Sequence, residues 1–359
     1  MHPNSNLILT STIVTAPSVN TLNFEALKIV QNKNMHPIST RAGACYQTND
    51  VIYTLQNSQN RVPTLREKML EYFRKEMMAY LKGVRVVDAE NGLGHASKYW
   101  FKIANHEREI NSNYGHYIFF QEIPGRQEIF PKNTQFFWAA ERLVENIHTR
   151  RAIININQLH HKQDEEYIED HEVVIENSRD FPCTVSLQFQ VIENKLHCIA
   201  NARSTDIITG LPYDIAFFSF VNELMYRHLK QNYSNVNESI QILELGPTVM
   251  KSECTQIYEN ALAEKAIKEI IGKTYFKLNK AWELQGPWSV GALIHDLSEH
   301  ISSVEKNNGA DNFDRNGSTY PNEIAATDPM PQITDANLVL HEIYSKEKPT
   351  SEVMKWVYQ

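Results

Sequence analysis

The chain has 359 residues, of which 42% are hydrophobic, enough to bury one large core or one core with an appendage. Its formal net charge of -8 argues against a protein that coats nucleic acid, because that role needs a basic face that displaces counterions from phosphates. A small anionic ligand bound by a few arginines is compatible with this charge.

The cysteines and the amino terminus indicate the compartment. Neither a zinc ribbon nor a disulfide scaffold is expected, because no two cysteines form a Cys-x-x-Cys pair. A reducing cytoplasm fits best. Residues 7–16 are mildly apolar but short, and no basic region precedes them, so we expect no signal, no anchor and no membrane partner. His160 and His161 lie beside an acidic run without ligand spacing, so no metal site is expected.

In the first half of the chain, Thr64 to Glu67 form a capping-box pattern that predicts a helix ending at Gly83. Apolar spacing predicts a second helix over residues 133–147, and residues 152–157 form a short β-rich run. Residues 163–178 are rich in Asp and Glu without a clean period, which is typical of a charged surface loop.

In the second half, polar and apolar residues alternate, which predicts strands at 183–191 and 195–203. Further patterns predict helices at 215–229 and 256–271, a strand at 239–246, a flexible linker at 307–331 and a weakly helical tail at 333–359. The tail ends in three residues without an assigned role: Trp356, Val357 and Tyr358.

The region from Asp180 to Asp214 carries the most informative motifs: Pro182-Cys183, Gln188-Phe189, Arg203-Ser204-x-Asp206, and Gly210-Leu-Pro-Tyr-Asp214. This pattern resembles the thymidylate synthase superfamily. Asp214, together with the Glu-Ile-Asn-Ser-Asn-Tyr-Gly run at 109–115, is similar to the deoxycytidylate and CMP 5-hydroxymethylase branch.

The resemblance implies an α/β (α+β) fold with a large mixed sheet flanked by helices, and a homodimer packed through its sheets. It divides the chain into an amino-terminal extension (1–40), a catalytic domain (41–303), and a linker with a carboxy-terminal tail (304–359). The expected location is the cytoplasm, or the host cytoplasm if a phage encodes the chain.

Cys183 is the candidate nucleophile. Adding a thiolate to C6 of a pyrimidine breaks its aromaticity and makes C5 an enamine carbon, and nearby arginines favour the thiolate. A cysteine at the start of an apolar strand is, taken alone, more often a small buried hydrophobe. The surrounding motif favours the nucleophile.

Arg150, Arg151, Arg203 and Ser204 suit a phosphate monoester, because guanidinium groups present paired N–H donors to oxyanions. The resemblance implies that Arg150 and Arg151 reach across a dimer interface, and that Arg203 and Ser204 belong to the protomer that supplies Cys183. It also implies that Arg41 and Gln188 bind the substrate.

Asp214 stands where an asparagine recognises uracil in related enzymes. Cytosine presents an amino donor at N4 and an acceptor at N3, and a carboxyl group can accept from the first and donate to the second. Asp214 therefore favours cytosine, the alternative being a helix N-cap. Thr184 follows the cysteine where thymidylate synthases usually have histidine and the phage hydroxymethylases have threonine, which favours water as the final nucleophile.

The resemblance assigns the remaining site residues. Glu76 organises water and proton transfer, the alternative being an ordinary exposed glutamate, and Tyr114 and Asn113 line the same cavity. Asp206, Trp100, Asn113 and Gly210 are expected to contact 5,10-methylenetetrahydrofolate, the one-carbon donor. The family's His-x-Tyr motif, which holds the sugar, appears here as Gln256-Ile257-Tyr258, so the sugar is left open between deoxyribose, which Ser204 favours, and ribose.

The leading hypothesis is an enzyme that hydroxymethylates C5 of a pyrimidine nucleoside monophosphate, dCMP first and CMP second, with no stable nucleic-acid partner. One alternative is a nucleotide methyltransferase of the thymidylate synthase type. A second is a nucleotide-binding paralogue without turnover, in which the tail docks partners.

Overall fold

A mixed β-sheet forms the centre of the computed structural model, which describes residues 11–29, 35–40, 42–88, 93–157, 180–275, 330–345 and 347–359. Eight strands of these residues make the sheet, in the order β1, β3, β8, β6, β5, β4, with β2 also pairing with β3 and β7 with β8. The strands are β1 Thr12–Ala16, β2 His36–Thr40, β3 Gly43–Leu55, β4 Ile153–Asn155, β5 Thr184–Ile192, β6 Lys195–Ala202, β7 Thr205–Asp206 and β8 Glu244–Tyr258.

The long strands β3 and β8 run antiparallel along most of their length, as do β5 and β6. The β1–β3, β6–β8 and β7–β8 pairs are parallel, so the sheet is mixed. The expected α/β architecture with a large mixed sheet flanked by helices is confirmed.

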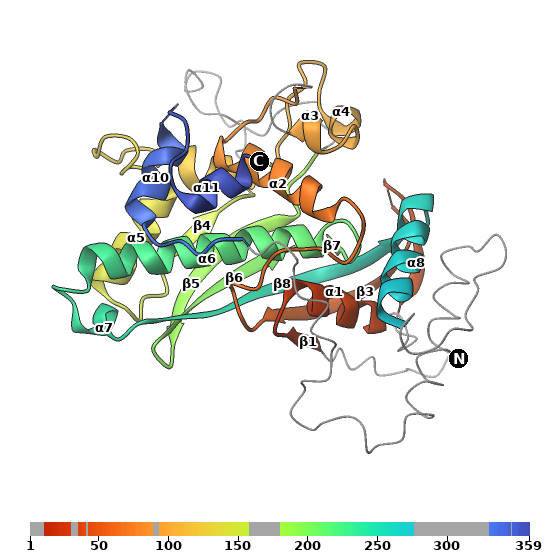
Figure 1. The fold of residues 1–359 in the computed structure, drawn as a ribbon, viewed down its shortest axis with the longest axis horizontal. Helices are drawn as coiled ribbons and strands as arrows, with labels where there is room; N and C mark the ends of the chain where they lie inside the picture. Colours follow the sequence, from red (N-terminus) through yellow and green to blue (C-terminus); the bar gives the residue numbers. More distant parts are fainter. Residues whose placement is uncertain are drawn as a thin grey trace, which may run out of the picture.

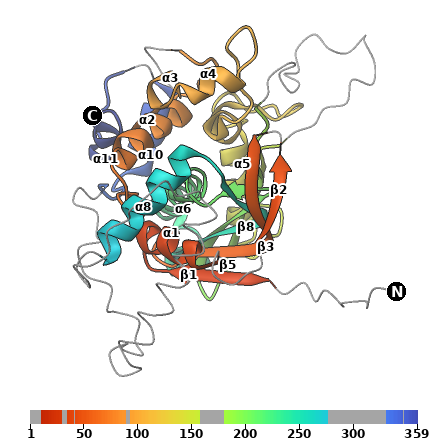
Figure 2. The same ribbon diagram turned by 90° about the vertical axis from the view of Figure 1, so that its right-hand side faces the viewer.

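The helices gather on one side of the strands β1, β3 and β8 (Figure 2). The long helix α6 packs against β6 and β8, and α1, α5 and α10 pack against α6. The helices are α1 Val19–Leu27, α2 Met69–Leu81, α3 Leu93–Ala96, α4 Tyr99–Ile103, the π-helix η2 His116–Phe120, α5 Gln135–Glu145, α6 Leu211–Tyr233, α7 Glu238–Gln241, α8 Ala261–Tyr275, α10 Ala336–Tyr344 and α11 Glu352–Val357.

The two faces of the sheet differ in burial, as the alternation in the sequence predicts. On β5 and β6, Leu187, Phe189 and Cys198 are fully buried on the side of α6. Alternate side chains such as Gln188 and His197 are partly exposed. The described helices therefore cover one face of the sheet.

An ion pair with no solvent exposure joins the segment before α2 to the middle of α6. Arg61 pairs with Glu223, and its guanidinium also donates to the carbonyl of Ser219 at 3.0 Å. Glu223 further accepts from Gln59 at 2.9 Å and from the backbone N–H of Ile333 at 3.2 Å. One buried charge pair thus fixes three distant parts of the chain, and removal of Glu223 would leave the Arg61 charge buried without this partner.

The carboxy-terminal tail forms two capped helices that pack on the main body (Figure 1). Asp335 caps α10 by accepting from two backbone N–H groups at 3.0 Å. Trp356 of α11 is 4% exposed; its ring centroid lies 6.3 Å from that of Phe73 and 4.3 Å from the guanidinium carbon of Arg74. Trp356, whose role the sequence left open, is therefore a core residue.

The predicted start of the helix at Thr64 is wrong, because α2 begins at Met69. The side chain of Asn20 bonds both the backbone N–H of Thr64 at 2.8 Å and its hydroxyl at 2.9 Å. Thr64 is therefore held by α1 and does not cap a helix. The predicted end is confirmed: Gly83 has φ +63, which favours glycine.

Two boundaries around β8 are also wrong. Residues 238–241 form α7, so the predicted strand at 239–246 begins only at Glu244. The strand then continues to Tyr258, because Gln256 pairs with Gln47 of β3 and with Asp206 of β7. The predicted helix at 256–271 therefore starts at Ala261 and, as α8, runs on to Tyr275.

The strands predicted at 183–191 and 195–203 and the helices predicted at 133–147 and 215–229 are confirmed as β5, β6, α5 and α6. The acidic run at 163–178, the His160-His161 pair and all but the end of the linker lie outside the described residues. The boundaries at 40 and 303 stay predictions, and β1 and α1 contribute side chains such as Val14 and Leu22 to the core.

Candidate active site

Cys183 lies in the turn before β5 and is partly exposed. Arg203 encloses this turn: its backbone N–H donates to the carbonyl of Cys183 at 2.9 Å, and its guanidinium donates to the carbonyls of Pro182 at 2.9 Å and Phe181 at 2.8 Å. The Cys183 Sγ lies 3.8 Å from Arg203 Nη2 and 3.5 Å from Ser204 Oγ. The Arg-Ser pair thus reaches the candidate nucleophile directly.

Burial raises the pKa of the Cys183 thiol, whereas Arg203 and Ser204 lower it, and the charges of Asp214 and Asp180 raise it further. Arg203 therefore acts in the direction that the sequence predicts, but burial outweighs it. Without a ligand, the site favours the thiol over the thiolate.

Two buried carboxyl groups lie on the two helices nearest this cysteine. Asp214 stands in the first turn of α6, is 8% exposed, and has its pKa raised to about 7 by burial. Glu76 stands on α2, is 6% exposed, and has its pKa raised to about 8 by burial and then by the charge of Asp214. Because the groups interact, the pair retains a proton near pH 7.

The N-cap alternative for Asp214 does not hold, because Gly210 occupies the N-cap position of α6. The backbone N–H of Asp214 donates to the carbonyl of Gly210 at 3.0 Å, as expected inside a helix. The exposed-surface alternative for Glu76 also fails, since that side chain is buried. Both carboxyl groups carry the cost of burial, and within the described part of the chain no cation contributes to the pKa shift of either, which is typical of functional groups.

Tyr114 is a buried side chain that lies near both Asp214 and Cys183. It is 4% exposed, and its ring centroid lies 5.4 Å from that of Tyr80 and 5.5 Å from that of Phe218. Burial raises its pKa well above the usual value, and the charges of Asp214 and Cys183 add to the rise. Tyr114 therefore lies within electrostatic range of both groups.

Asp180 is a site residue that the sequence did not reveal. Its carboxylate accepts from the hydroxyl of Ser112 at 2.5 Å and from the backbone N–H of Ser112 at 2.6 Å, and its carbonyl accepts from Asn111 at 3.0 Å. These bonds fix the segment of Tyr114 against the segment of Cys183. A contact between residues so distant in sequence leaves no local pattern.

Asn113 is fully buried, and its amide group bonds to the backbone. It donates to the carbonyls of Ala79 at 3.0 Å and Val84 at 2.5 Å, and accepts from the N–H of His116 at 2.9 Å. The side chain thus ties the end of α2 to the start of η2. Its contact with a cofactor stays a prediction.

The other predicted phosphate ligands lie at the edge of the sheet. Arg150 and Arg151 are exposed just before β4, the edge strand. Gln188 donates to the carbonyl of Arg150 at 3.4 Å, and Arg151 pairs with Glu145 at 3.5 Å. Within the described residues these bonds lead away from Cys183, and Arg41 lies outside those residues.

Gln256 and Tyr258 point to the same side of β8 and bond to each other. The Tyr258 hydroxyl donates to the Gln256 carbonyl oxygen at 3.0 Å, and the Gln256 amide donates to Gln47 at 2.8 Å. Gln256, which stands where the family's motif has histidine, is thus part of a chain of hydrogen bonds that runs from β8 to β3.

Asp206 and Gly210 lie at the turn that leads into α6. Asp206 accepts from the N–H groups of Ile208 at 2.6 Å and Thr209 at 3.0 Å, and burial raises its pKa. A Cβ at Gly210 would lie 3.1 Å from the Asp206 carbonyl oxygen, so the turn has little room for a larger residue. Trp100 is partly exposed on α4.

Four further residues complete the cluster and were missed. Arg66 donates to the carbonyl of Ile208 at 2.7 Å and to the Tyr213 hydroxyl at 3.3 Å. The Tyr213 ring lies 4.7 Å from that of Tyr72, and the Tyr72 hydroxyl donates to Glu76 at 3.1 Å. The fourth is Tyr80, which lies four residues after Glu76 on α2. Because Tyr72, Glu76 and Tyr80 are spaced four residues apart in the sequence, this spacing could have indicated that they share one face of a helix.

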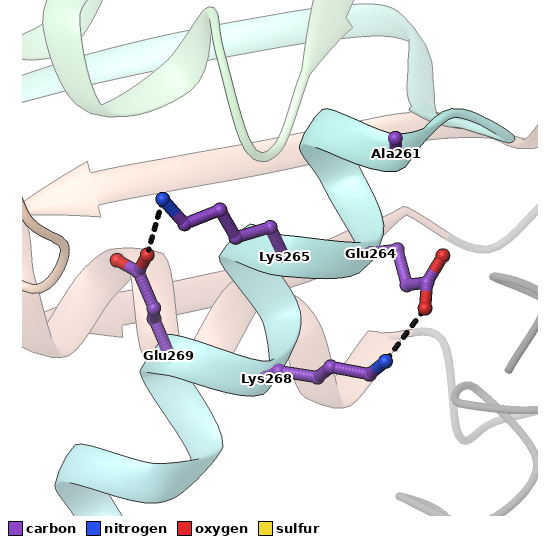
Figure 3. A pocket seen from close by; sticks show the side chains of 5 residues that line it. All are labelled: Ala261, Glu264, Lys265, Lys268 and Glu269. Carbon is purple, nitrogen blue, oxygen red and sulfur yellow. Dashed lines mark hydrogen bonds and ion pairs between the residues drawn. The ribbon is translucent and has the colours of Figure 1, made fainter. Parts of the chain in front are cut away.

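Two hollows lie apart from Cys183. One, of about 520 Å³, is lined by α8, where Lys265 pairs with Glu269 and Lys268 with Glu264 (Figure 3). The other, of about 530 Å³, lies between α2 and residues 357–359. In the first hollow, each lysine pairs with a glutamate one turn away on the same helix, which is an ordinary feature of an exposed helix surface.

Among the described residues, no helix has both the length and the apolar character needed to cross a membrane. The same residues include no group of three or more His, Cys, Asp or Glu side chains placed to bind a metal ion.

The family model described as thymidylate synthase matches residues 27–282. The chain is similar to the deoxycytidylate 5-hydroxymethyltransferase of Enterobacteria phage T4, with 25% identity over 189 residues that cover 52% of this chain and 67% of the relative.

Two other relatives match over shorter stretches. The phage T6 protein of the same name is 28% identical over 152 residues, which cover 42% of this chain and 54% of the relative. The thymidylate synthase of Vesicomyosocius okutanii is 41% identical over 51 residues, which cover 14% of this chain and 19% of the relative. Because the family model matches well over half of the sequence, the chain belongs to the thymidylate synthase family.

Proposed function

We propose that this protein transfers a hydroxymethyl group to C5 of dCMP, with 5,10-methylenetetrahydrofolate as the one-carbon donor and Cys183 as the nucleophile at C6. Family membership supports one-carbon transfer to a nucleotide. The names of the phage relatives support the substrate and the product.

The buried carboxyl group of Asp214 is the observation that supports cytosine, and not uracil, as the base of the substrate. With a pKa of about 7, this group is present in both protonation states near neutral pH. The carboxylate accepts from the cytosine N4 amino group, and the carboxylic acid donates to N3. An asparagine in the orientation that reads uracil directs its amide N–H to O4 and its carbonyl oxygen to N3–H, so in that orientation it would face the cytosine N4 amino group with a donor and N3 with an acceptor.

The chemistry begins at Cys183. Its thiol loses a proton, the sulfur bonds to C6, and the electron pair of the C5–C6 double bond becomes available at C5. Tyr114 and Asp214 lie close enough to influence the charge on the ring. Transfer of the one-carbon unit to C5, followed by loss of the C5 proton and departure of the carrier, would leave an exocyclic methylene on C5. Water adds to the methylene carbon and gives up a proton to Glu76, and release of the Cys183 thiolate from C6 restores the C5–C6 double bond.

The residues around the start of α6 fit a pteridine ring. Trp100 offers a partly exposed flat apolar surface, and Asp206 offers an acceptor for ring N–H groups. Gly210 keeps this turn narrow. The donor supplies a one-carbon unit at the oxidation level of formaldehyde when bound, and Asn113 helps to hold the wall of the cavity.

Arg203 and Ser204 are proposed to bind the phosphate beside Cys183 in the same protomer. Arg150 and Arg151 are exposed at the sheet edge and are proposed to serve the site of a second protomer, packed through the partly exposed face of the sheet. Gln188 on that face and Arg41 are proposed as further substrate contacts. Each site of the homodimer would then need two chains.

Gln256 and Tyr258 are proposed to bind the sugar. Both are tied into the hydrogen-bond chain to Gln47, so their polar atoms are held in fixed directions. This arrangement suits recognition of the 3′-hydroxyl, which dCMP and CMP share. The sugar therefore has to be identified by assay.

The test is product analysis with three nucleotides. Purified protein is incubated with dCMP, dUMP or CMP and 5,10-methylenetetrahydrofolate, and the products are identified by mass spectrometry. A 5-hydroxymethyl product from dCMP supports the proposal. A product from dUMP alone would contradict the cytosine assignment, and a methyl product with stoichiometric dihydrofolate would indicate a methyltransferase.

A further inference from the structure

Two tyrosines flank Glu76 on its own helix. Tyr72 and Tyr80 stand four residues before and four residues after Glu76 on α2, so all three side chains share one face. The Tyr72 hydroxyl donates to Glu76 Oε1 at 3.1 Å. The Tyr80 hydroxyl also stabilises the charged form of Glu76, since it lowers the pKa of that carboxyl against the effect of burial.

Both rings are fixed by their packing. The Tyr72 ring lies 4.7 Å from that of Tyr213, and the Tyr80 ring lies 4.7 Å from that of Phe217 and 5.4 Å from that of Tyr114. Phe217 and Tyr213 belong to α6, the helix of Asp214. The two hydroxyls are thus held by rings locked between α2 and α6.

The titratable groups that face Glu76 come from three elements. Tyr72 and Tyr80 belong to α2, Tyr213 and Asp214 to α6, and Tyr114 to the segment before η2. Arg66 bonds to Tyr213 and is the cation next to this group. Asp214 carries a negative charge toward Glu76, so the two tyrosine hydroxyls are the groups that favour the Glu76 carboxylate.

We propose that Tyr72 and Tyr80 are positioning residues that hold the Glu76 carboxyl in one orientation and so set where the attacking water is activated. The idea rests on the proposed function, in which Glu76 takes a proton from that water. A carboxyl held by two fixed hydroxyls keeps its remaining lone pairs in a constant direction, whereas a free one would rotate.

The experiment removes the hydroxyls and keeps the rings, with Tyr72→Phe, Tyr80→Phe and the double variant. Tyr226→Phe on α6 is the matched control, because its partly buried ring lies next to Arg227 and outside this group. The ionisation of Glu76 is followed by infrared difference spectroscopy of the carboxyl stretch, and the band is assigned by its loss in Glu76→Gln. The pH profile of kcat and the KM for dCMP are measured on the same proteins.

In each single variant we expect the titration midpoint of Glu76 to rise by about one pH unit, the order expected for losing one hydrogen bond to a charged group. The kcat should fall about tenfold and its pH profile should move in the same direction, with KM changed by less than about twofold. Tyr226→Phe should match the wild type.

An unchanged Glu76 midpoint in both variants would overturn the inference, as would a fall in kcat without any shift in the pH profile, because that indicates a purely structural effect. The infrared titration needs no turnover. If the wild-type protein makes no 5-hydroxymethyl-dCMP, the proposed function fails, while the titration still decides whether Tyr72 and Tyr80 hold Glu76.

Discussion

Asp214→Asn is the substitution that most directly tests how the base is chosen. The side chain is 8% exposed in the first turn of α6, and asparagine has nearly the same volume, so the fold should tolerate the change. The carboxyl group becomes an amide with one acceptor and one donor group. We expect the preference to move from dCMP toward dUMP.

The magnitude follows from the number of mismatched groups. The N4 amino group and the N3 atom of cytosine both contact this side chain in the proposed complex, and each buried mismatch costs about 1–3 kcal/mol. Two mismatches give roughly 2–6 kcal/mol, which corresponds to a change of about 30-fold to 20,000-fold in the ratio of kcat/KM for dCMP to that for dUMP.

The assay measures kcat/KM for each nucleotide separately, with products identified by mass spectrometry. Asp335→Asn is the matched control, because Asp335 caps α10 and asparagine caps a helix equally well. A ratio for Asp214→Asn that stays within about threefold of the wild type would refute base recognition by Asp214.

Three further outcomes are expected. Cys183→Ala should abolish turnover, because no atom remains to bond C6, while calorimetry still detects dCMP binding. Glu76→Gln should raise the free energy of unfolding in urea by roughly 2–4 kcal/mol at pH 9 and leave it nearly unchanged at pH 5. The reason is that the Glu76 pKa lies at about 8 in the folded protein, against 4.5 for an ordinary glutamate, so the stability that this carboxyl contributes when protonated is lost progressively as the pH rises between those two values. Trp356→Ala should lower the free energy of unfolding by about 3–5 kcal/mol in the same urea assay, because it empties a core position.

Each of these outcomes has a control. Cys198→Ala removes a buried sulfur from β6 and should keep activity, whereas a Cys183→Ala protein with full activity would exclude the covalent mechanism. If Glu76→Gln changes the free energy of unfolding by the same amount at pH 5 and at pH 9, the Glu76 carboxyl group is not held protonated in the folded protein. Ile129 is 85% exposed, so Ile129→Ala should leave the free energy of unfolding nearly unchanged. If Trp356→Ala lowers that free energy as little as Ile129→Ala does, the tail does not belong to the core.

Local patterns predicted the elements whose side chains alternate or repeat regularly. The alternation at Val185 to Val191 predicts a strand with one buried face, and β5 has that form from Leu187 onward, whereas Val185 is exposed where the register shifts. Long-range partners decided the elements that were misplaced: Asn20 holds Thr64 outside α2, and β3 with β7 extends β8 to Tyr258. Pairing with distant strands does not appear in a local window.

The same distinction applies to the candidate site: a local motif marks some of its residues, and only the fold reveals others. A motif in the sequence marks Cys183, Arg203 and Ser204, and the structure brings these three together. Asp180 has no such mark, because its role is a bond to Ser112 that only the fold creates. Sequence reasoning found groups proposed to do chemistry, and the structure was needed to find those that position them.

The packing of α11 on α2 also bears on biosynthesis. The ribosome makes α2 early, and most of the described chain follows before Trp356 emerges to cover Phe73. Until then the nascent protein leaves apolar side chains of α2 such as Phe73 without this cover, and such surfaces bind chaperones or aggregate. The helix that carries Glu76 should therefore be fully packed only after synthesis of the tail, which makes premature termination costly even beyond the region shared with the family.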